Sequence, residues 1–233
     1  MLTLLNLKKE LRMKASPKKA KILQRFFKTG HGEYGEGDVF LGVVVPDIRK
    51  LVKEYSDLKL KEAVKLLHSK IHEERLTALL IMVSQFQAEK NEEKVYNLYL
   101  KNTKYINSWD LVDLSADKIV GVYLASKSKL ILCELSKSKN IWERRISIIS
   151  TFCFIKNNRF EETLKIAKIL LSDEHDLIHK AVGWMLREVG KRDLKTEEEF
   201  LKKYYKRMPR TMLRYAIEKF PEKKRKKYLL NLI

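Results

Sequence analysis

Cysteine, glycine and proline are all scarce in this chain of 233 residues, and each shortage excludes a class of protein. Its two cysteines, Cys133 and Cys153, both lie in apolar runs, so we expect reduced core thiols in place of a disulfide framework. The eight glycines and four prolines form no stretch with the composition of a linker. The sequence therefore predicts one continuous domain over residues 1–233.

Long apolar runs are missing too. No stretch of about 18 apolar residues occurs, so no membrane-spanning helix is predicted. Residues 1–14 combine a short apolar part with following lysines, which indicates an amphipathic helix and not a signal peptide. We therefore expect a soluble, cytoplasmic protein without a membrane partner.

Positive charge is what the chain has in excess. Its 49 Lys and Arg against 30 Asp and Glu give a formal net charge of +19. This excess favours a polyanionic partner such as nucleic acid, although a highly charged solvated exterior would explain it as well. Residues 202–227 are especially basic, with tyrosines and a phenylalanine between the charges. Within them, Arg210 and Arg214 are one helical turn apart and could clamp a phosphate, whereas the run "KKRKK" could equally be a solvated face.

Helical spacing of apolar residues covers nearly all of the chain. It predicts helices over residues 46–55, 73–86, 141–155, 160–171, 175–190, 209–220 and 221–233. Gly190 is expected to cap its helix, and residues 38–46 are expected to form an extended loop, because a single strand would have no partner. Helix pairs recurring about every 40 residues predict an all-α fold, a right-handed α-α superhelix of HEAT-like or armadillo-type repeats with a concave basic cleft.

Metal and nucleotide chemistry have little support. Two histidine pairs, His68 with His72 and His175 with His179, have the spacing to share a metal. Neither pair has a cysteine or a further carboxylate at a characteristic ligand spacing. The glycine-rich segment around residues 30–42 follows no strand and carries no phosphate-binding lysine motif. We expect neither a metal nor a cofactor.

An indole and a carboxylate at helical spacing are the first candidate site. In "NSWDLVD", Trp109 and Asp113 would share one helix face. The pair is either core plus cap or is directed at a ligand. Aromatic and cationic residues also alternate later in the chain, where Arg144 and Arg145 follow Trp142 and Lys180 precedes Trp184. A helix face that carries both an aromatic ring and a cation is suited to contact the DNA backbone and bases.

Several motifs together resemble one known family. "YGEGDVFLGVVVPDIRKL", "NSWDLVDLSADKIVG", "IWERRISIISTF", "HKAVGWMLREVGKRD" and "MPRTMLRYAIEKF" look like the DNA alkylation repair family of AlkD-like HEAT-repeat DNA glycosylases, in order and over nearly the whole chain. The resemblance implies that Trp109, Asp113, Arg145 and Trp184 line the catalytic cleft. The early-helix aromatic residue of the family, often a tyrosine, corresponds to Phe26 or Phe27, and Val44 stands where the family usually has a basic residue.

The resemblance also implies a partner and a reaction. The partner would be double-stranded DNA carrying alkylated bases, used by a monomeric, monofunctional glycosylase on the DNA of a bacterial-type nucleoid. The residues expected to bind this DNA are Phe26, Arg144, Lys180, Arg187, Arg210 and Arg214. Two alternatives remain, namely a non-catalytic HEAT-repeat protein that binds damaged or branched DNA and a protein–protein scaffold. Binding to a protein partner would be insensitive to salt, whereas phosphate contacts weaken steeply as salt rises.

Elementary chemistry agrees with a role for the carboxylate. A purine alkylated at N3 or N7 is cationic, so its glycosidic bond is weakened and breaks through an oxocarbenium-like transition state. A carboxylate beside C1′ stabilises that cation by roughly 3–4 kcal/mol, by analogy with other preorganised groups, and can orient the attacking water. For Asp113 this predicts catalysis, and the simpler alternative is a solvated acid.

Overall fold

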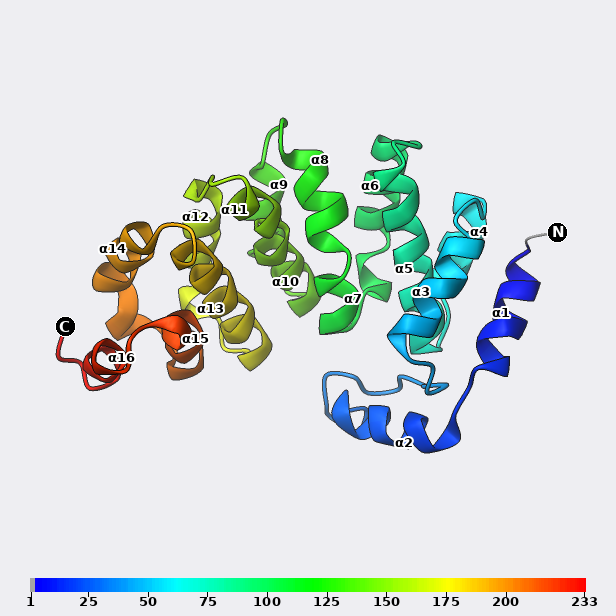
Figure 1. The fold of residues 1–233 in the computed structure, drawn as a ribbon, viewed down its shortest axis with the longest axis horizontal. Helices are drawn as coiled ribbons and strands as arrows, with labels where there is room; N and C mark the ends of the chain where they lie inside the picture. Colours follow the sequence, from blue (N-terminus) through cyan, green and yellow to red (C-terminus); the bar gives the residue numbers. More distant parts are fainter. Residues whose placement is uncertain (1–2) are drawn as a thin grey trace. The chain divides into compact units, whose positions relative to one another are not determined.

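The structure is a computed structural model that describes residues 3–233, and these residues are built from helices (Figure 1). They divide into two compact units, Met1–Ile119 and Val120–Ile233. The first unit contains α1 (Leu4–Met13), α2 (Pro17–Phe26), α3 (Val45–Glu54), α4 (Leu60–Leu67), α5 (His72–Gln87), α6 (Glu92–Lys101), the 3₁₀ turn η1 (Thr103–Tyr105) and α7 (Trp109–Asp113). The π-helical turn η2 (Asp117–Gly121) follows.

The second unit is helical throughout as well. It contains α8 (Val122–Leu124), α9 (Leu130–Leu135), α10 (Ile141–Ser150), α11 (Phe152–Lys156), α12 (Glu161–Ile169), η3 (Leu170–Ser172), α13 (Asp176–Gly190), α14 (Leu194–Tyr204), η4 (Tyr205–Arg207), α15 (Arg210–Ala216), η5 (Ile217–Lys219) and α16 (Glu222–Leu229). Across residues 3–233 the only β-type pairing is one isolated bridge. The all-α prediction is therefore confirmed.

Local sequence sets the helix starts. The Thr3 side chain accepts a hydrogen bond from the Asn6 amide at 3.2 Å and begins α1, the amphipathic helix predicted for the first residues. Pro46 lies in the first turn of α3, where its missing N–H costs nothing. The apolar stripe predicted for α3 is buried at Ile48, Leu51 and Val52.

The first unit is organised around α5. Almost every residue of this helix is buried, because α3, α4, α6 and α7 pack against it. Its first four residues, His72 to Arg75, are all charged or titratable and all buried. Charged groups at buried positions need partners, so this end of α5 must bind other parts of the unit.

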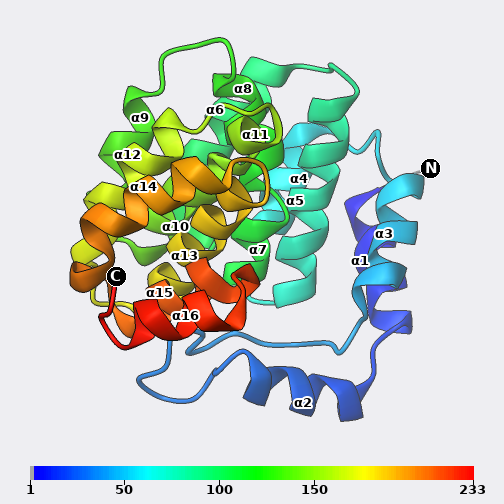
Figure 2. The same ribbon diagram turned by 60° about the vertical axis from the view of Figure 1, so that its left-hand side comes forward.

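Helix α2 contrasts with α5, because none of its residues is buried. Figures 1 and 2 show it running crosswise below the ends of α1 and α3. Its tight contact with the unit is at Gly42 (φ +81°), where an added Cβ would lie 2.2 Å from the Ser16 carbonyl oxygen. Between α2, α3 and α5 an apolar cavity of about 360 Å³ remains, and Phe27, Phe40, Val43 and Leu76 are among its lining residues.

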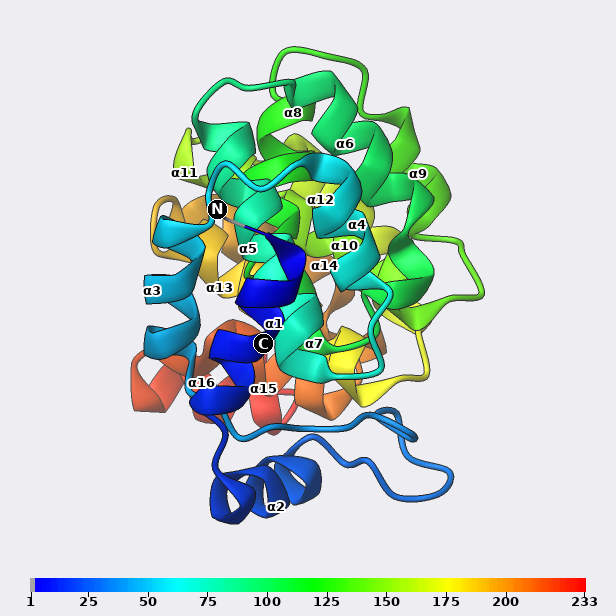
Figure 3. The same ribbon diagram turned by 90° about the vertical axis from the view of Figure 1, so that its right-hand side faces the viewer.

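The segment between α2 and α3 contains most of the extended loop that the sequence predicts over residues 38–46, although Val45 and Pro46 already belong to α3. It passes beneath the ends of α5 and α7 (Figure 3). Its one β-type contact is a parallel bridge between Val39 and Ile71, in which the His72 amide donates to the Val39 carbonyl at 2.9 Å. We refer to residues 27–44 as the anchor loop, because the first residues of α5 hold it in place.

In the second unit, α13 is the central helix and packs on α10, α14 and most extensively on α15 (Figure 2). Gly183 permits this close approach, because an added Cβ would lie 2.4 Å from the Met212 carbonyl oxygen and 2.5 Å from the Tyr215 Cβ. Cys153 is buried in α11 and Cys133 is half-buried in α9, and both are free thiols.

Several details differ from the sequence-based expectations. The helices expected over residues 160–171 and 209–220 each end in a 3₁₀ turn, η3 and η5. The helix expected over residues 141–155 is broken into α10 and α11 at Thr151, whose hydroxyl donates to the Ile148 carbonyl at 2.7 Å. Such back-bonding by threonine bends helices. Gly190 does not cap α13, since the cap is Lys191 in a right-handed conformation. Gly190 instead leaves room for the Glu197 carboxyl group, which would lie 1.6 Å from an added Cβ.

The buried Glu197 makes stability depend on pH. Burial, together with repulsion from Glu198, raises the pKa of Glu197 to about 8. Because the folded-state pKa is above that of the unfolded chain, the associated stability is present below about pH 4.5 and is lost as pH rises through about 8. Between pH 6 and 9 we expect wild type to lose about 1–3 kcal/mol more unfolding free energy than Glu197→Gln.

Urea denaturation at the two pH values measures this difference. The matched control is Glu199→Gln, which changes an exposed carboxylate on the same helix and should behave like wild type. If wild type and Glu197→Gln lost equal unfolding free energy between pH 6 and 9, Glu197 would not be protonated in the folded protein.

Candidate functional site

Trp109 begins α7 and belongs to a continuous aromatic stack in the first unit. Its ring stacks on Phe27 with centroids 5.1 Å apart and an interplanar angle of 11°, and Phe27 stacks on Phe40 at 5.1 Å. Phe26 meets the edge of Trp109 at 5.8 Å and is 62% exposed. The indole N–H donates to the Tyr34 hydroxyl at 3.2 Å. Trp109 is thus half-buried and fixed in orientation, with an exposed aromatic side chain next to it.

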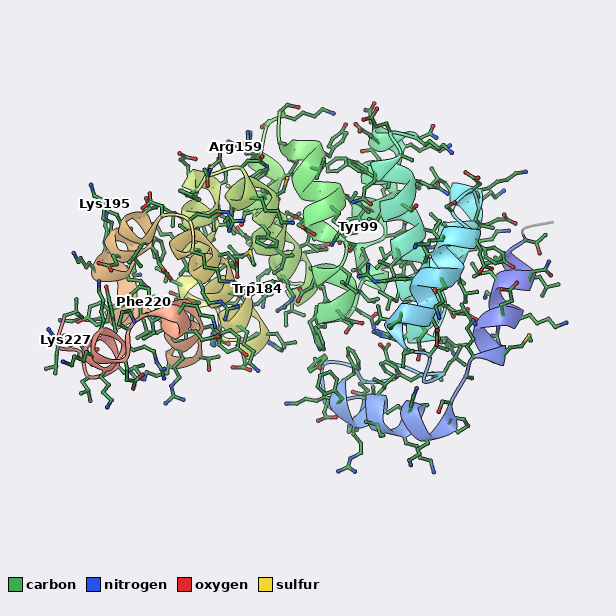
Figure 4. The ribbon with its side chains drawn as sticks, in the orientation of Figure 1. Tyr99, Arg159, Trp184, Lys195, Phe220 and Lys227 are labelled. Atoms are coloured by element: carbon green, nitrogen blue, oxygen red, sulfur yellow. The ribbon has the colours of Figure 1, made fainter. Side chains whose placement is uncertain are left out.

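Asp113 ends the same short helix, one turn after Trp109. α7 contains five residues, of which Trp109 is the first and Asp113 the last. Both side chains are half-buried. The residues that follow α7 are hydrogen-bonded to α6. The hydroxyl of Tyr99, which is fully buried (Figure 4), lies 2.9 Å from the Ser115 hydroxyl. Three of the predicted site residues thus lie in the first unit, with Phe26 against the edge of Trp109 and Asp113 on the same short helix as Trp109.

A buried charged cluster surrounds the start of α7. His72 of α5 contacts the Asp110 carboxylate through Nε2 at 2.8 Å and the Asp38 carboxylate through Nδ1 at 3.3 Å. Asp38 also accepts from Arg75 at 2.5 Å and from Asn107 at 3.0 Å. The cluster joins the anchor loop, α5 and the residues that flank Trp109.

The pKa values in this cluster follow from burial and pairing. Burial alone would lower the pKa of His72, but the attraction and hydrogen bond of Asp110, together with the bond to Asp38, raise it to about 9. Burial acts to raise the pKa of Asp38, yet the bonds to His72 and Asn107 and the charge of Arg75 leave it lowered. At neutral pH the cluster therefore holds His72 as an imidazolium.

Glu73, the next residue of α5, holds the anchor loop through its backbone. One carboxylate oxygen accepts from the amides of Gly42 at 2.7 Å and Val43 at 3.2 Å, and the other accepts from Leu41 at 2.9 Å. Glu74 then forms ion pairs with Lys8 and Arg12 of α1, each at 3.0 Å. Each of the four residues 72–75 thus binds a segment outside its own helix.

Sequence reasoning missed this cluster. It considered His72 only as half of a metal pair and gave no role to Glu73, Glu74 or Arg75. The available signal was four consecutive charged or titratable residues opening a helix whose other residues are mostly apolar, because such residues need partners when they are buried. Within residues 3–233, no three His, Cys, Asp or Glu side chains gather as a metal ion would require.

The second unit contains the other two predicted catalytic residues. Trp184 lies on α13, half-buried, with its indole N–H donating to Glu188 at 3.2 Å and its ring 5.9 Å from Phe152 (Figure 4). Arg145 lies on α10, is only 5% exposed, and donates to the Leu177 carbonyl at 2.5 Å. In the second unit Arg145 thus connects α10 to the first turn of α13.

The cations predicted to bind DNA differ in how strongly they are engaged by other protein groups. Arg144 and Arg187 are engaged within the protein, Arg144 by Asp173 at 2.6 Å and two backbone carbonyls, and Arg187 by Glu218. Lys180 pairs with Asp176 at 2.7 Å yet keeps 39% of its side chain exposed. Arg210 and Arg214 are exposed on α15, and Arg210 donates to the Leu229 carbonyl at 2.9 Å. α15 therefore offers the most accessible cations of the set.

The structure is that of an all-α helical-repeat protein, with Trp109 and Asp113 on one short helix of the first unit and exposed cations on α15 of the second. None of the helices in residues 3–233 combines the length and apolar character needed to cross a membrane. A family model described as DNA alkylation repair enzyme matches residues 7–220. The chain belongs to this family.

One solved structure supports the fold. It is described as a predicted DNA alkylation repair enzyme from Enterococcus faecalis, and it superposes with a TM-score of 0.68 at 20% identity, covering 90% of this chain and 98% of its own. Comparison with curated proteins gave no match.

Proposed function

We propose that the protein is a DNA glycosylase that excises cationic N3- or N7-alkylated purines from duplex DNA. The observation that carries the proposal is the half-buried Asp113 one turn after the oriented Trp109, beside the exposed Phe26. Membership of a DNA alkylation repair family and the net charge of +19 support DNA as the substrate. The enzyme would act as a cytoplasmic monomer on nucleoid DNA.

The reaction needs little from the protein beyond charge and orientation. The bond between C1′ and the base nitrogen breaks, and its electron pair leaves with the base, which becomes neutral. Asp113 stabilises the cation that develops on the sugar and orients the water that adds to C1′, and the water's proton passes to the carboxylate or solvent. The π-face of Trp109, held by Phe27 and Tyr34, contacts the sugar or the cationic base. No lysine takes the role of a Schiff-base nucleophile, so the product is an abasic site.

Release of methylated base from duplex DNA containing 7-methylguanine or 3-methyladenine tests the proposal. We expect wild-type protein to release the base faster than a no-enzyme control and to leave an abasic strand that is not cleaved. No release, combined with salt-sensitive DNA binding, would refute the glycosylase and favour the non-catalytic DNA-binding alternative. No base release, together with no salt-sensitive binding of DNA, would favour the protein–protein scaffold.

Arg210 and Arg214 test the proposed phosphate contacts. Replacing both by alanine should weaken binding about equally for different DNA sequences and lower the slope of log affinity against log salt by about 1–2. Fluorescence anisotropy at several salt concentrations measures both quantities. Lys195→Ala is the matched control, since it removes an exposed cation of α14 outside the proposed set (Figure 4). A slope unchanged from wild type would show that these arginines do not contact phosphate.

A further inference from the structure

His72 connects two segments that are distant in sequence and converge on α7. It is 2% exposed, and both of its ring nitrogens face carboxylates, those of Asp38 in the anchor loop and Asp110 in the first turn of α7. A neutral imidazole has one N–H donor, so it could bond only one of the two carboxylates. Both contacts are hydrogen bonds only when the ring is an imidazolium, which has two donors.

Every charged neighbour of this imidazolium is accounted for in the first unit. Asp38 comes from the anchor loop, Asp110 from α7, and Arg75 and Glu73 from α5 itself. The remaining ring contacts are apolar, with centroids of Phe40 at 4.5 Å and Phe27 at 4.9 Å. Glu73 is occupied by backbone amides and Arg75 by Asp38, so Asp38 and Asp110 are the direct partners of His72.

α7 depends on such external contacts. Five residues form barely more than one helical turn, and no side chain caps its start, since the Ser108 hydroxyl has no hydrogen-bond partner. An isolated helix of this length is unstable in water. Asp110, which His72 holds, directly follows Trp109 and precedes Asp113 by three residues. Asp110 therefore ties down the helix that carries both candidate site residues, in addition to the contacts that Trp109 makes with Phe27 and Tyr34.

We propose that His72, bonded on both sides as an imidazolium, is a positioning residue that fixes α7 and thereby Trp109 and Asp113. The inference rests on the proposed function for its kinetic consequence, because base excision is the activity that the two residues would perform. His72 itself does not touch the DNA. It acts through Asp110, and also through Phe27, which meets the His72 ring at an interplanar angle of 43° and stacks on the Trp109 indole.

The proposal predicts an alkaline limit to excision. The His72 pKa of about 9 means that the double contact is present at neutral pH and is lost as pH rises through about 9. Misplacement of a catalytic group by about 1 Å can cost 10²-fold in rate. We expect the single-turnover rate of base release to fall at least about tenfold across this limit, with little change in DNA affinity.

Asp110→Asn makes the test specific. It removes the attraction that most strongly raises the His72 pKa, so the alkaline limit should move about one unit or more toward neutral pH. His72→Gln should show no such limit and a lower rate at every pH. The matched control is His68→Gln, which changes the exposed histidine at the end of α4 and should leave the profile unchanged. Rates are corrected for spontaneous base loss at each pH.

A second readout separates this inference from the proposed function. The NMR signal of the Trp109 indole N–H should shift with the same pH midpoint as the His72 ring, in the absence of DNA. If wild type released no base at any pH, the proposed function would fail, while a shared midpoint would still support positioning of Trp109 by His72. Three results would overturn the inference. They are an excision rate that does not fall at alkaline pH, a pH limit that is the same in Asp110→Asn as in wild type, and an indole signal that does not change when His72 titrates.

Discussion

Asparagine in place of Asp113 is expected to slow release of methylated base about 10²-fold or more, while DNA affinity stays within about threefold of wild type. Asparagine keeps the size of the side chain and removes its negative charge. The charge matters most when positive charge develops on the sugar, and much less when intact DNA binds. A loss in the rate of the chemical step without a loss in affinity is the sign of an interaction made in the transition state.

Single-turnover base release and equilibrium DNA binding, measured on the same preparations, give the two quantities. Asp57→Asn serves as the control, because it neutralises an exposed carboxylate of the same unit whose side chain is 73% accessible. It should release base at the wild-type rate. Equal rates for Asp113→Asn and wild type would remove Asp113 from the mechanism and leave Trp109 without a catalytic partner.

Much of the fold was predictable because helices are encoded locally. The apolar stripe of Ile48, Leu51 and Val52 gave the buried face of α3, and Pro46 gave its start. The break at Thr151 and the role of Gly190 could not be found in this way. Each depends on a particular contact, the threonine hydroxyl with its own helix and the glycine with the Glu197 carboxyl group.

The candidate site was predictable only in part, for a physical reason. Trp109 and Asp113 are separated by one helical turn, so their shared helix follows from spacing. The cluster that holds them joins Asp38, His72 and Asp110, which are more than 30 residues apart in sequence at each step. Periodicity identifies a buried face but not the partner that covers it, so such long-range pairs stay hidden in a single sequence.

Hydrogen bonds to the backbone cannot be predicted from a sequence for a further reason. The amides of Leu41, Gly42 and Val43 have no side-chain signature, yet they are the hydrogen-bond partners of the buried Glu73 side chain. The structure therefore gives Glu73 a role that composition could not suggest. It stabilises the anchor loop, which in turn presents Asp38 to His72.

Glu73→Ala should consequently lower the unfolding free energy by about 3 kcal/mol or more. The substitution leaves the three amides of residues 41–43 without their acceptor, and each unsatisfied buried group costs about 1–3 kcal/mol. The unfolding free energy of Glu73→Gln should lie between those of wild type and Glu73→Ala. The single carbonyl oxygen of glutamine can accept from the amides of Gly42 and Val43, but no second oxygen remains to accept from Leu41.

Urea denaturation and amide hydrogen exchange together test this order. The exchange of the amides at residues 41–43 should accelerate in Glu73→Ala more than that of amides in α4, because the loss begins in the anchor loop. Glu54→Ala removes an exposed carboxylate at the end of α3 and is expected to change stability by less than about 0.5 kcal/mol. Should Glu73→Ala and Glu54→Ala unfold at the same urea concentration, the three hydrogen bonds would contribute nothing net. The anchor loop would then have to be held by its other contacts, among them the buried bonds of Asp38 to His72 and Arg75 and the bridge between Val39 and Ile71.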